Sequence, residues 1–230
     1  TTGIENTCLG YNCDIYDVIL TVTDTNDCFD KDTITTTVNC NPIANFNFVS
    51  ECEGDTVFFN NTSNVNTTVH SGHILIDTLW NFGVSPLALD TVSDPQYAYQ
   101  NTGIYDITLT VTDNQTPQCS NSFIDSIEIF PTPYIGFTST QECQEGDDPT
   151  QFTPNNPNIW FWNWGIDTSL GDYIWSDSTS ETPTFQFDSC IASGSIVTLN
   201  VEDINGCKND TQAIVTVFCN PTASFTTTND

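Results

Sequence analysis

The stretch from Tyr105 to Asp113 reads YDITLTVTD, and it decides the fold. Its apolar residues Tyr105, Ile107, Leu109 and Val111 fall at every second position, with Asp and Thr between them. Strict alternation of this kind, rich in Thr and β-branched residues, predicts a strand that is half buried. Nearly the same line, YDVILTVTD, ends at Asp24, and a weaker copy, SIVTLNVED, ends at Asp203.

The spacing of these copies predicts tandem domains. Asp113 lies 89 residues after Asp24, and Asp203 lies 90 residues after Asp113. A constant period of this size in a chain without helical periodicity indicates a repeated unit made of strands. We expect four parts: a partial unit at 1–40, whole units at 41–130 and 131–219, and the first strand of a further unit at 220–230.

Four ordered motifs in the unit 41–130 resemble those of the polycystic kidney disease (PKD) domain. They are Pro-x-Ala-x-Phe from Pro42, Trp-x-Phe-Gly from Trp80, Asp-Pro…Tyr from Asp94, and Gly-x-Tyr-x-Ile-x-Leu-x-Val-x-Asp from Gly103. The resemblance implies an all-β fold of tandem immunoglobulin-like (PKD-like) β-sandwich domains, about 90 residues each. It also implies an extracellular place, at the cell surface or secreted. The chain departs from the usual family pattern at Asn81 and Asn163, where an Asp is common.

The charge balance excludes several classes of partner. The 230 residues include 30 Asp and Glu but only 2 Lys and Arg, which gives a formal net charge of −28. Nucleic-acid binding needs Lys and Arg to neutralise phosphates, so we expect no nucleic-acid partner. Anionic membrane surfaces are disfavoured for the same reason. The sequence has no apolar run of about 18 residues, so we expect no direct insertion into a membrane.

Ten cysteines without a CxxC motif predict disulfides in an oxidising compartment. In a sandwich, the strand near Cys52 and the loop after Asp113 lie close. We therefore expect Cys52–Cys119 and, one period later, Cys143–Cys207. Cysteines near the ends of strands suggest two further pairs, Cys13–Cys40 and Cys190–Cys219. Cys8 and Cys28 either pair with each other or with cysteines outside this sequence.

The aromatic run at 160–164 admits two interpretations. Trp160, Trp162 and Trp164 share one face of a strand, as a platform for sugar stacking would. The motif FWNWG at 161–165 also matches LWNFG at 79–83, which aligns Trp162 with Trp80, the expected core tryptophan. Packing in the core is the favoured interpretation. Trp160 and Trp175 have no counterpart in the unit 41–130 and are the candidates for ligand contact.

Candidate metal sites are weak. Asp24, Asn26, Asp30 and Asp32 alternate in a manner similar to a calcium loop, but the Gly and the closing Glu of such a loop are missing. Calcium is the only cofactor that the sequence suggests. His70 and His73 form HxxH, but two ligands do not make a zinc site.

Two patterns suggest glycosylation. The pattern Asp-Thr/Ser-aliphatic resembles an O-glycan acceptor of some bacterial surface proteins, and N-x-Ser/Thr is the acceptor for N-linked glycans. The candidates are Thr33, Thr56, Thr78, Thr91 and Ser126 for the first pattern, and Asn61, Asn66, Asn114 and Asn209 for the second.

The sequence favours a structural role over catalysis. With two His and no Gly-x-Ser-x-Gly motif, a catalytic triad is not evident, and an active site is normally built once rather than repeated. We expect a segment of an extracellular filament, stalk or giant cell-surface adhesin, stiffened by disulfides within its domains. Its partners would be further repeats of its own chain, copies of itself, or surface glycans and cells. The alternative is a pair of accessory modules that hold a substrate or carbohydrate for a secreted hydrolase.

Overall fold

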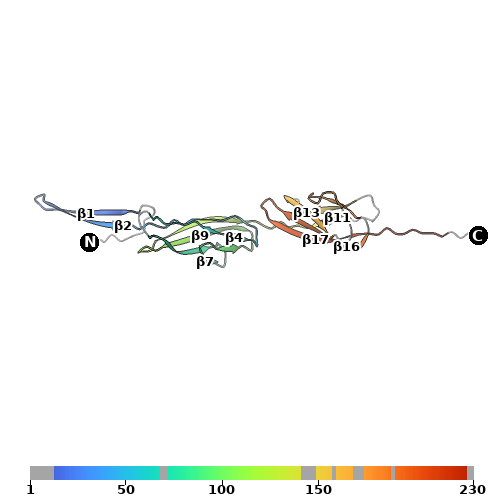
Figure 1. Cartoon of the computed structure of the whole chain (residues 1–230), viewed down its shortest axis with the longest axis horizontal. Helices are drawn as coiled ribbons and strands as arrows, with labels where there is room; N and C mark the ends of the chain where they lie inside the picture. The colour runs from blue at the N-terminus through green and yellow to red at the C-terminus, as the bar shows by residue number, and fades with distance from the viewer. Residues whose placement is uncertain are drawn as a thin grey trace, which may run out of the picture. The chain divides into compact units, whose positions relative to one another are not determined.

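The computed structural model describes residues 13–67, 72–140, 149–156, 159–167, 174–187 and 190–226. All regular elements in these ranges are β-strands, so the protein is all-β as expected (Figure 1). The chain divides into two compact units, Thr1–Ile129 and Phe130–Asp230. The first unit holds an N-terminal hairpin and a sandwich that we call the first sandwich (41–129). The second unit holds the second sandwich (130–219).

The N-terminal hairpin is a two-stranded antiparallel sheet of β1 (Ile15–Thr23) and β2 (Phe29–Thr37). Its register places Thr23 opposite Phe29 and Ile15 opposite Thr37. The turn between the strands contains Asp27, whose φ of 63° lies in the left-handed region. The strand copy that ends at Asp24 runs along β1, and no further strand of the described residues pairs with β1 or β2.

The first sandwich has a four-stranded sheet in the order β10-β9-β6-β7. Two strand pairs, β3 with β5 and β4 with β8, complete it. Side chains from both sets of strands form one core in which Val57, Trp80 and Leu109 are fully buried. The bounds of its strands are β3 (Phe46–Asn47), β4 (Thr56–Phe58), β5 (Asn60–Asn61), β6 (Leu75–Asn81), β7 (Leu89–Asp90), β8 (Gln96–Ala98), β9 (Gly103–Asp113) and β10 (Ser120–Ile129).

The glycine of the Trp-x-Phe-Gly motif has a steric reason. Gly83 has φ of 71°, and a Cβ at this position would lie 2.6 Å from the carbonyl oxygen of Asp106 in β9. Only glycine has both the backbone freedom and the space for this close approach. The turn after β6 can therefore pack directly on the central strand of the sheet.

The second sandwich repeats this plan with a different division of strands. One sheet has the order β13-β16-β17 and the other β11-β12-β15-β14. Its core contains Phe152, Trp164 and Leu199. The bounds are β11 (Phe137–Ser139), β12 (Thr150–Pro154), β13 (Phe161–Ile166), β14 (Ile174–Trp175), β15 (Thr184–Gln186), β16 (Ile191–Glu202) and β17 (Lys208–Val217).

The alignment of the core tryptophans from sequence was wrong by two residues. In the first sandwich Trp80 lies opposite Leu109, and at the equivalent position of the second sandwich Trp164 lies opposite Leu199. The indole N–H groups agree with this match, since Trp80 donates to the Val92 carbonyl and Trp164 to the Ser180 carbonyl, each at 3.0 Å. A shift of two residues keeps every side chain on the same face, so alternation alone cannot detect it.

Candidate functional site: the aspartate turns and disulfides

The aspartate that ends each strand copy organises the turn that follows it. Asp113 Oδ1 accepts the backbone N–H groups of Gln115 at 3.1 Å and Cys119 at 2.9 Å. Asp203 Oδ1 accepts those of Asn205 and Cys207, both at 2.9 Å. An Asp that accepts backbone N–H groups a few residues later is a common way to build a turn. The repeat therefore preserves a carboxylate because the hairpin needs it.

The same turn occurs in the N-terminal hairpin. Asp24 Oδ1 accepts the backbone N–H of Asn26 at 2.8 Å and that of Cys28 at 3.0 Å. The hydrogen bond from Asn26, followed by that from Cys28, holds the pKa of Asp24 below its ordinary value, because both bonds favour the ionised carboxylate. A predicted calcium ligand is thus a turn-forming acceptor.

The structure identifies both cysteines of two disulfides that were expected from the sequence. Cys13 is bonded to Cys40 and Cys190 to Cys219, with Cα–Cα distances of 4.9 and 4.8 Å. Cysteines bonded in this way are typical of proteins in oxidising compartments.

The other expected disulfide pairs stay predictions. Cys52, Cys119 and Cys207 are buried and disulfide-bonded. Cys8 and Cys143 lie outside the described residues, so neither the Cys143–Cys207 pair nor a bond of Cys8 is described. The Cys52–Cys119 pair also stays a prediction. Cys28 is exposed and free.

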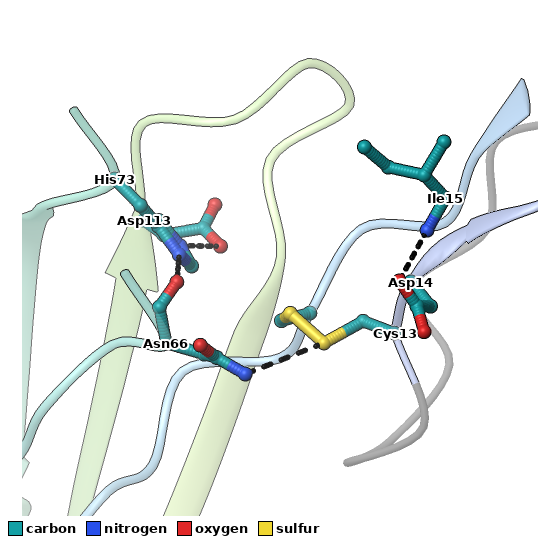
Figure 2. Close-up of a disulfide and its surroundings, with 7 residues drawn as sticks. Cys13, Asp14, Ile15, Asn66, His73 and Asp113 are labelled. Carbon is teal, nitrogen blue, oxygen red and sulfur yellow. Dashed lines mark hydrogen bonds and ion pairs between the residues drawn. A yellow bond between two sulfur atoms is a disulfide. The ribbon is translucent and has the colours of Figure 1, made fainter. Parts of the chain in front are cut away.

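A buried histidine–aspartate pair lies beside the Asp113 turn. His73 Nε2 is 2.8 Å from Asp113 Oδ2, and both side chains have 0% exposure (Figure 2). His73 Nδ1 is 3.0 Å from the carbonyl oxygen of Asn66. Both ring nitrogens of His73 thus lie at hydrogen-bonding distance from an oxygen atom. No local pattern in the sequence links His73 to an aspartate 40 residues away.

This pair belongs to a chain of contacts between the Cys13–Cys40 disulfide and the first sandwich. The side-chain amide of Asn66 donates to Cys13 Sγ at 3.8 Å, while the backbone carbonyl of Asn66 faces His73 (Figure 2). From the other side, the buried Asn39 donates its amide to the Pro117 carbonyl in the Asp113 turn at 3.3 Å. The site therefore fastens the hairpin ends to the loops of the sandwich.

A second contact is repeated in both sandwiches. The amide of Asn121 donates to the Pro42 carbonyl at 2.9 Å, and that of Asn209 donates to the Pro133 carbonyl at 2.8 Å. In each sandwich this bond joins the last strand to the proline that opens the unit. The hydrogen bond therefore holds the segment around the proline, where the chain enters the sandwich, against the last strand.

No cluster suited to a metal ion is found among the described residues. In the predicted calcium loop, Asp30 Oδ1 accepts the N–H of Lys31, and Asp30 and Asp32 lie opposite Val22 and Leu20 on the neighbouring strand. His70 lies outside the described residues. A calcium requirement stays a prediction.

The two candidate tryptophans have different surroundings. Trp160 is 76% exposed and is followed by the exposed Phe161. Trp175 is half-buried and packs against Phe152 and Phe185, with ring centroids 5.4 and 4.7 Å apart. Trp175 therefore contributes to the core, and Trp160 is the one tryptophan of the two whose ring is open to a ligand.

The predicted glycosylation residues are mostly accessible. Thr33, Thr56, Thr91, Ser126, Asn114 and Asn209 are exposed, and Thr78, Asn61 and Asn66 are half-buried. The Thr78 hydroxyl donates to the Thr91 carbonyl at 2.8 Å. The amides of Asn66, Asn114 and Asn209 each donate a hydrogen bond within the fold, so a glycan there would have to leave the second N–H in that bond.

Comparisons with known proteins find similar solved domains. No protein-family model and no curated protein matches the chain. The PKD1 domain of the Vibrio cholerae metalloprotease PrtV is 30% identical over 39% of this chain and 98% of that domain, with a TM-score of 0.32. The PKD1 domain of Vibrio anguillarum Epp is 25% identical over 40% of this chain and 98% of that domain, with a TM-score of 0.34. The human desmocollin-1 ectodomain is 12% identical over 92% of this chain and 52% of that one, with a TM-score of 0.30.

The fold class rests on the sheets and cores described above, which are those of immunoglobulin-like sandwiches. The part of the chain that the structure describes has no helix with the length and apolar character needed to cross a membrane.

Proposed function

We propose that this chain is a structural segment of an extracellular filament, stalk or giant cell-surface adhesin, made of tandem PKD-like sandwiches. The observation that carries the proposal is the repetition of one fastening in each unit. The aspartate turn occurs three times, and the disulfides at Cys13–Cys40 and Cys190–Cys219 lie at the ends of hairpins. Repeated reinforcement suits a part that carries load, whereas catalysis needs one accessible site.

The best candidate for catalytic chemistry supports this assignment. His73 and Asp113 form a histidine–aspartate pair of the kind used in acid–base catalysis, yet both side chains are fully buried. No substrate can reach them without opening the domain, and their partners are the loops that they hold. The charge of the chain is consistent with a projecting array, since strong like charge opposes lateral association of neighbouring copies.

Electron microscopy of the native material without reductant tests the proposal. We expect thin, uniform fibres, beaded at one-domain or two-domain spacing and much longer than two sandwiches. A reductant should loosen the beads, and a chelator separates a calcium requirement from disulfide reinforcement. Short, separate particles would exclude the filament.

One observation favours a second candidate, an accessory carbohydrate-binding module. Trp160 is 76% exposed, and Phe161 beside it lines a surface cleft with Glu202 and Lys208. An exposed aromatic ring beside polar groups is a common platform for a sugar ring. Binding of soluble polysaccharides that is lost in Trp160→Ala but kept in Trp175→Phe would favour this function.

A further inference from the structure

The N-terminal hairpin reproduces β9 and β10 of the first sandwich in detail. Thr35 donates its hydroxyl to Asp17 at 2.8 Å, and the equivalent Ser126 donates to Asp106 at 2.7 Å. The turn at Asp24 has the same two backbone bonds as the turn at Asp113. The hairpin is therefore the final strand pair of a sandwich by register, cross-strand contacts and turn.

The face of β1 that corresponds to the core is uncovered. Leu20 and Val22 are 62% and 55% exposed. Their counterparts Leu109 and Val111 have 0% exposure in the first sandwich, and Leu199 and Val201 have 0% and 3% in the second. An exposed apolar face of this kind normally needs a cover.

The two sandwiches show what covers this face. In each, the central strand also pairs with a strand that carries the core tryptophan: β9 with β6, and β16 with β13. The tryptophan lies opposite the leucine that corresponds to Leu20 in both. That strand lies earlier in the same polypeptide than the hairpin it covers.

We infer that β1 and β2 complete a third sandwich whose other strands are a segment of the same polypeptide ahead of the hairpin, built like residues 41–101. This segment pairs its tryptophan strand with the edge of β1 that is opposite β2, with the indole over Leu20. The inference depends on the fold alone and is independent of the function proposed above.

The state of Cys28 is an independent indication that a further segment covers the hairpin. Its counterparts after the other two aspartates, Cys119 and Cys207, are buried and disulfide-bonded, whereas Cys28 is exposed and free. In the complete sandwich Cys28 is therefore buried and bonded to a cysteine of the covering segment.

An extended chain tests this inference. A second copy of residues 41–101 replaces residues 1–12, so that Cys13 takes the place that Thr102 has in the first sandwich. Alkylation under native conditions, followed by mass spectrometry, reports the state of Cys28. We expect full alkylation of Cys28 in the original chain, and a disulfide with no alkylation in the extended chain.

Substitutions on the two faces of β1 separate covering from mere extension. Leu20→Asp in the extended chain should restore alkylation of Cys28, because a carboxylate would be buried against the tryptophan. Ile19→Asp is the matched control, since Ile19 corresponds to Thr108 on the opposite face and its replacement should leave Cys28 protected.

A positive control keeps the test decisive if the extended chain folds poorly. In this control, residues 102–131 replace residues 13–40 after the added segment, which rebuilds the first sandwich in the added position. If the copy of Cys119 is protected there while Cys28 stays fully alkylated in the extended chain, the inference is overturned. Protection of Cys28 in the original chain that grows with protein concentration would also overturn it, because a second copy would then be the cover.

Discussion

Asp113 uses both oxygens of its side chain. Oδ1 accepts two backbone N–H groups of its turn, and Oδ2 faces the ring of His73. In the N-terminal hairpin the equivalent Asp24 is exposed, and its Oδ1 accepts the backbone N–H groups of the turn. The aspartate that marks the repeat is thus a turn residue in all three hairpins, and in the first sandwich it also has the buried His73 as a partner.

Removing His73 should destabilise the first sandwich strongly. His73→Leu leaves the buried Oδ2 of Asp113 without its partner His73 Nε2, which we expect to cost about 1–3 kcal/mol in the free energy of unfolding. The double variant His73→Leu/Asp113→Asn removes the charge as well and should recover part of that loss. Urea unfolding measures both, and a single variant that is as stable as the double variant would contradict the assignment.

The turn at Asp24 should weaken in acid. Its pKa is lowered below 3.8 in the folded hairpin, so the ionised carboxylate stabilises the turn above the unfolded value. This stabilisation is lost as pH falls through the lowered pKa. We expect the amide signals of Asn26 and Cys28 in NMR spectra to shift together with a midpoint below 3.8, and to lose this titration in Asp24→Asn. A midpoint at or above 3.8 would refute the turn bonding.

At the scale of the elements, the hairpin is the unit that repeats most faithfully. The pairs β1–β2, β9–β10 and β16–β17 are all antiparallel and all close with an aspartate turn. The strands before them are less alike, since the first sandwich has two short pairs where the second has one four-stranded sheet. The long hairpins have regular alternation and a stiff turn, so their register depends little on the rest of the domain.

The Cys190–Cys219 disulfide should contribute to the stability of the second sandwich. It joins residues 29 apart around the hairpin β16–β17, and chain entropy for such a loop predicts roughly 3–4 kcal/mol. The variant Cys190→Ala/Cys219→Ala should lower the free energy of unfolding of that sandwich by this amount. The matched variant Cys13→Ala/Cys40→Ala removes a disulfide with a similar sequence separation of 27, which lies at the ends of the N-terminal hairpin. Calorimetry should show no loss for the second sandwich in the matched variant; an equal loss in both would disprove the local effect.

At the scale of the whole molecule, two separate cores determine how the chain unfolds. One core is built around Trp80 and the other around Trp164, and each lies within its own compact unit. Each core buries enough aromatic surface to be cooperative by itself. The two units should therefore respond separately to substitutions in their cores.

Calorimetry should resolve this independence. Trp80→Phe should lower the free energy of unfolding of the first sandwich alone, and Trp164→Phe that of the second alone. We expect a loss of roughly 1–3 kcal/mol in each case, because packing and the indole hydrogen bond are lost. Trp160→Phe is the control, since a ring that is 76% exposed should leave both transitions unchanged. One transition that moves as a whole in either core variant would show that the units unfold together.

The sequence by itself determined those features of this protein that depend on short-range patterns of residues. Alternation along Tyr105–Asp113, its copies at Asp24 and Asp203, and the charge of −28 are properties of the sequence alone. They predict strands and repetition and argue against a nucleic-acid partner, because face periodicity and net charge need no knowledge of distant contacts. The pairs Cys13–Cys40 and Cys190–Cys219 were also within reach, since strand ends in one hairpin lie together.

The tertiary structure decided what depends on contacts between distant residues. The core position of Trp164 required strand register, which a two-residue shift hides from the pattern. The pairing of His73 with Asp113 required two side chains 40 residues apart in the sequence to meet in a buried position. The uncovered face of Leu20 and Val22 became visible only as exposure, because the sequence of β1 is almost the same as that of a buried strand. Burial is a property of the assembled domain, so local pattern can state which face should be covered but not whether anything covers it.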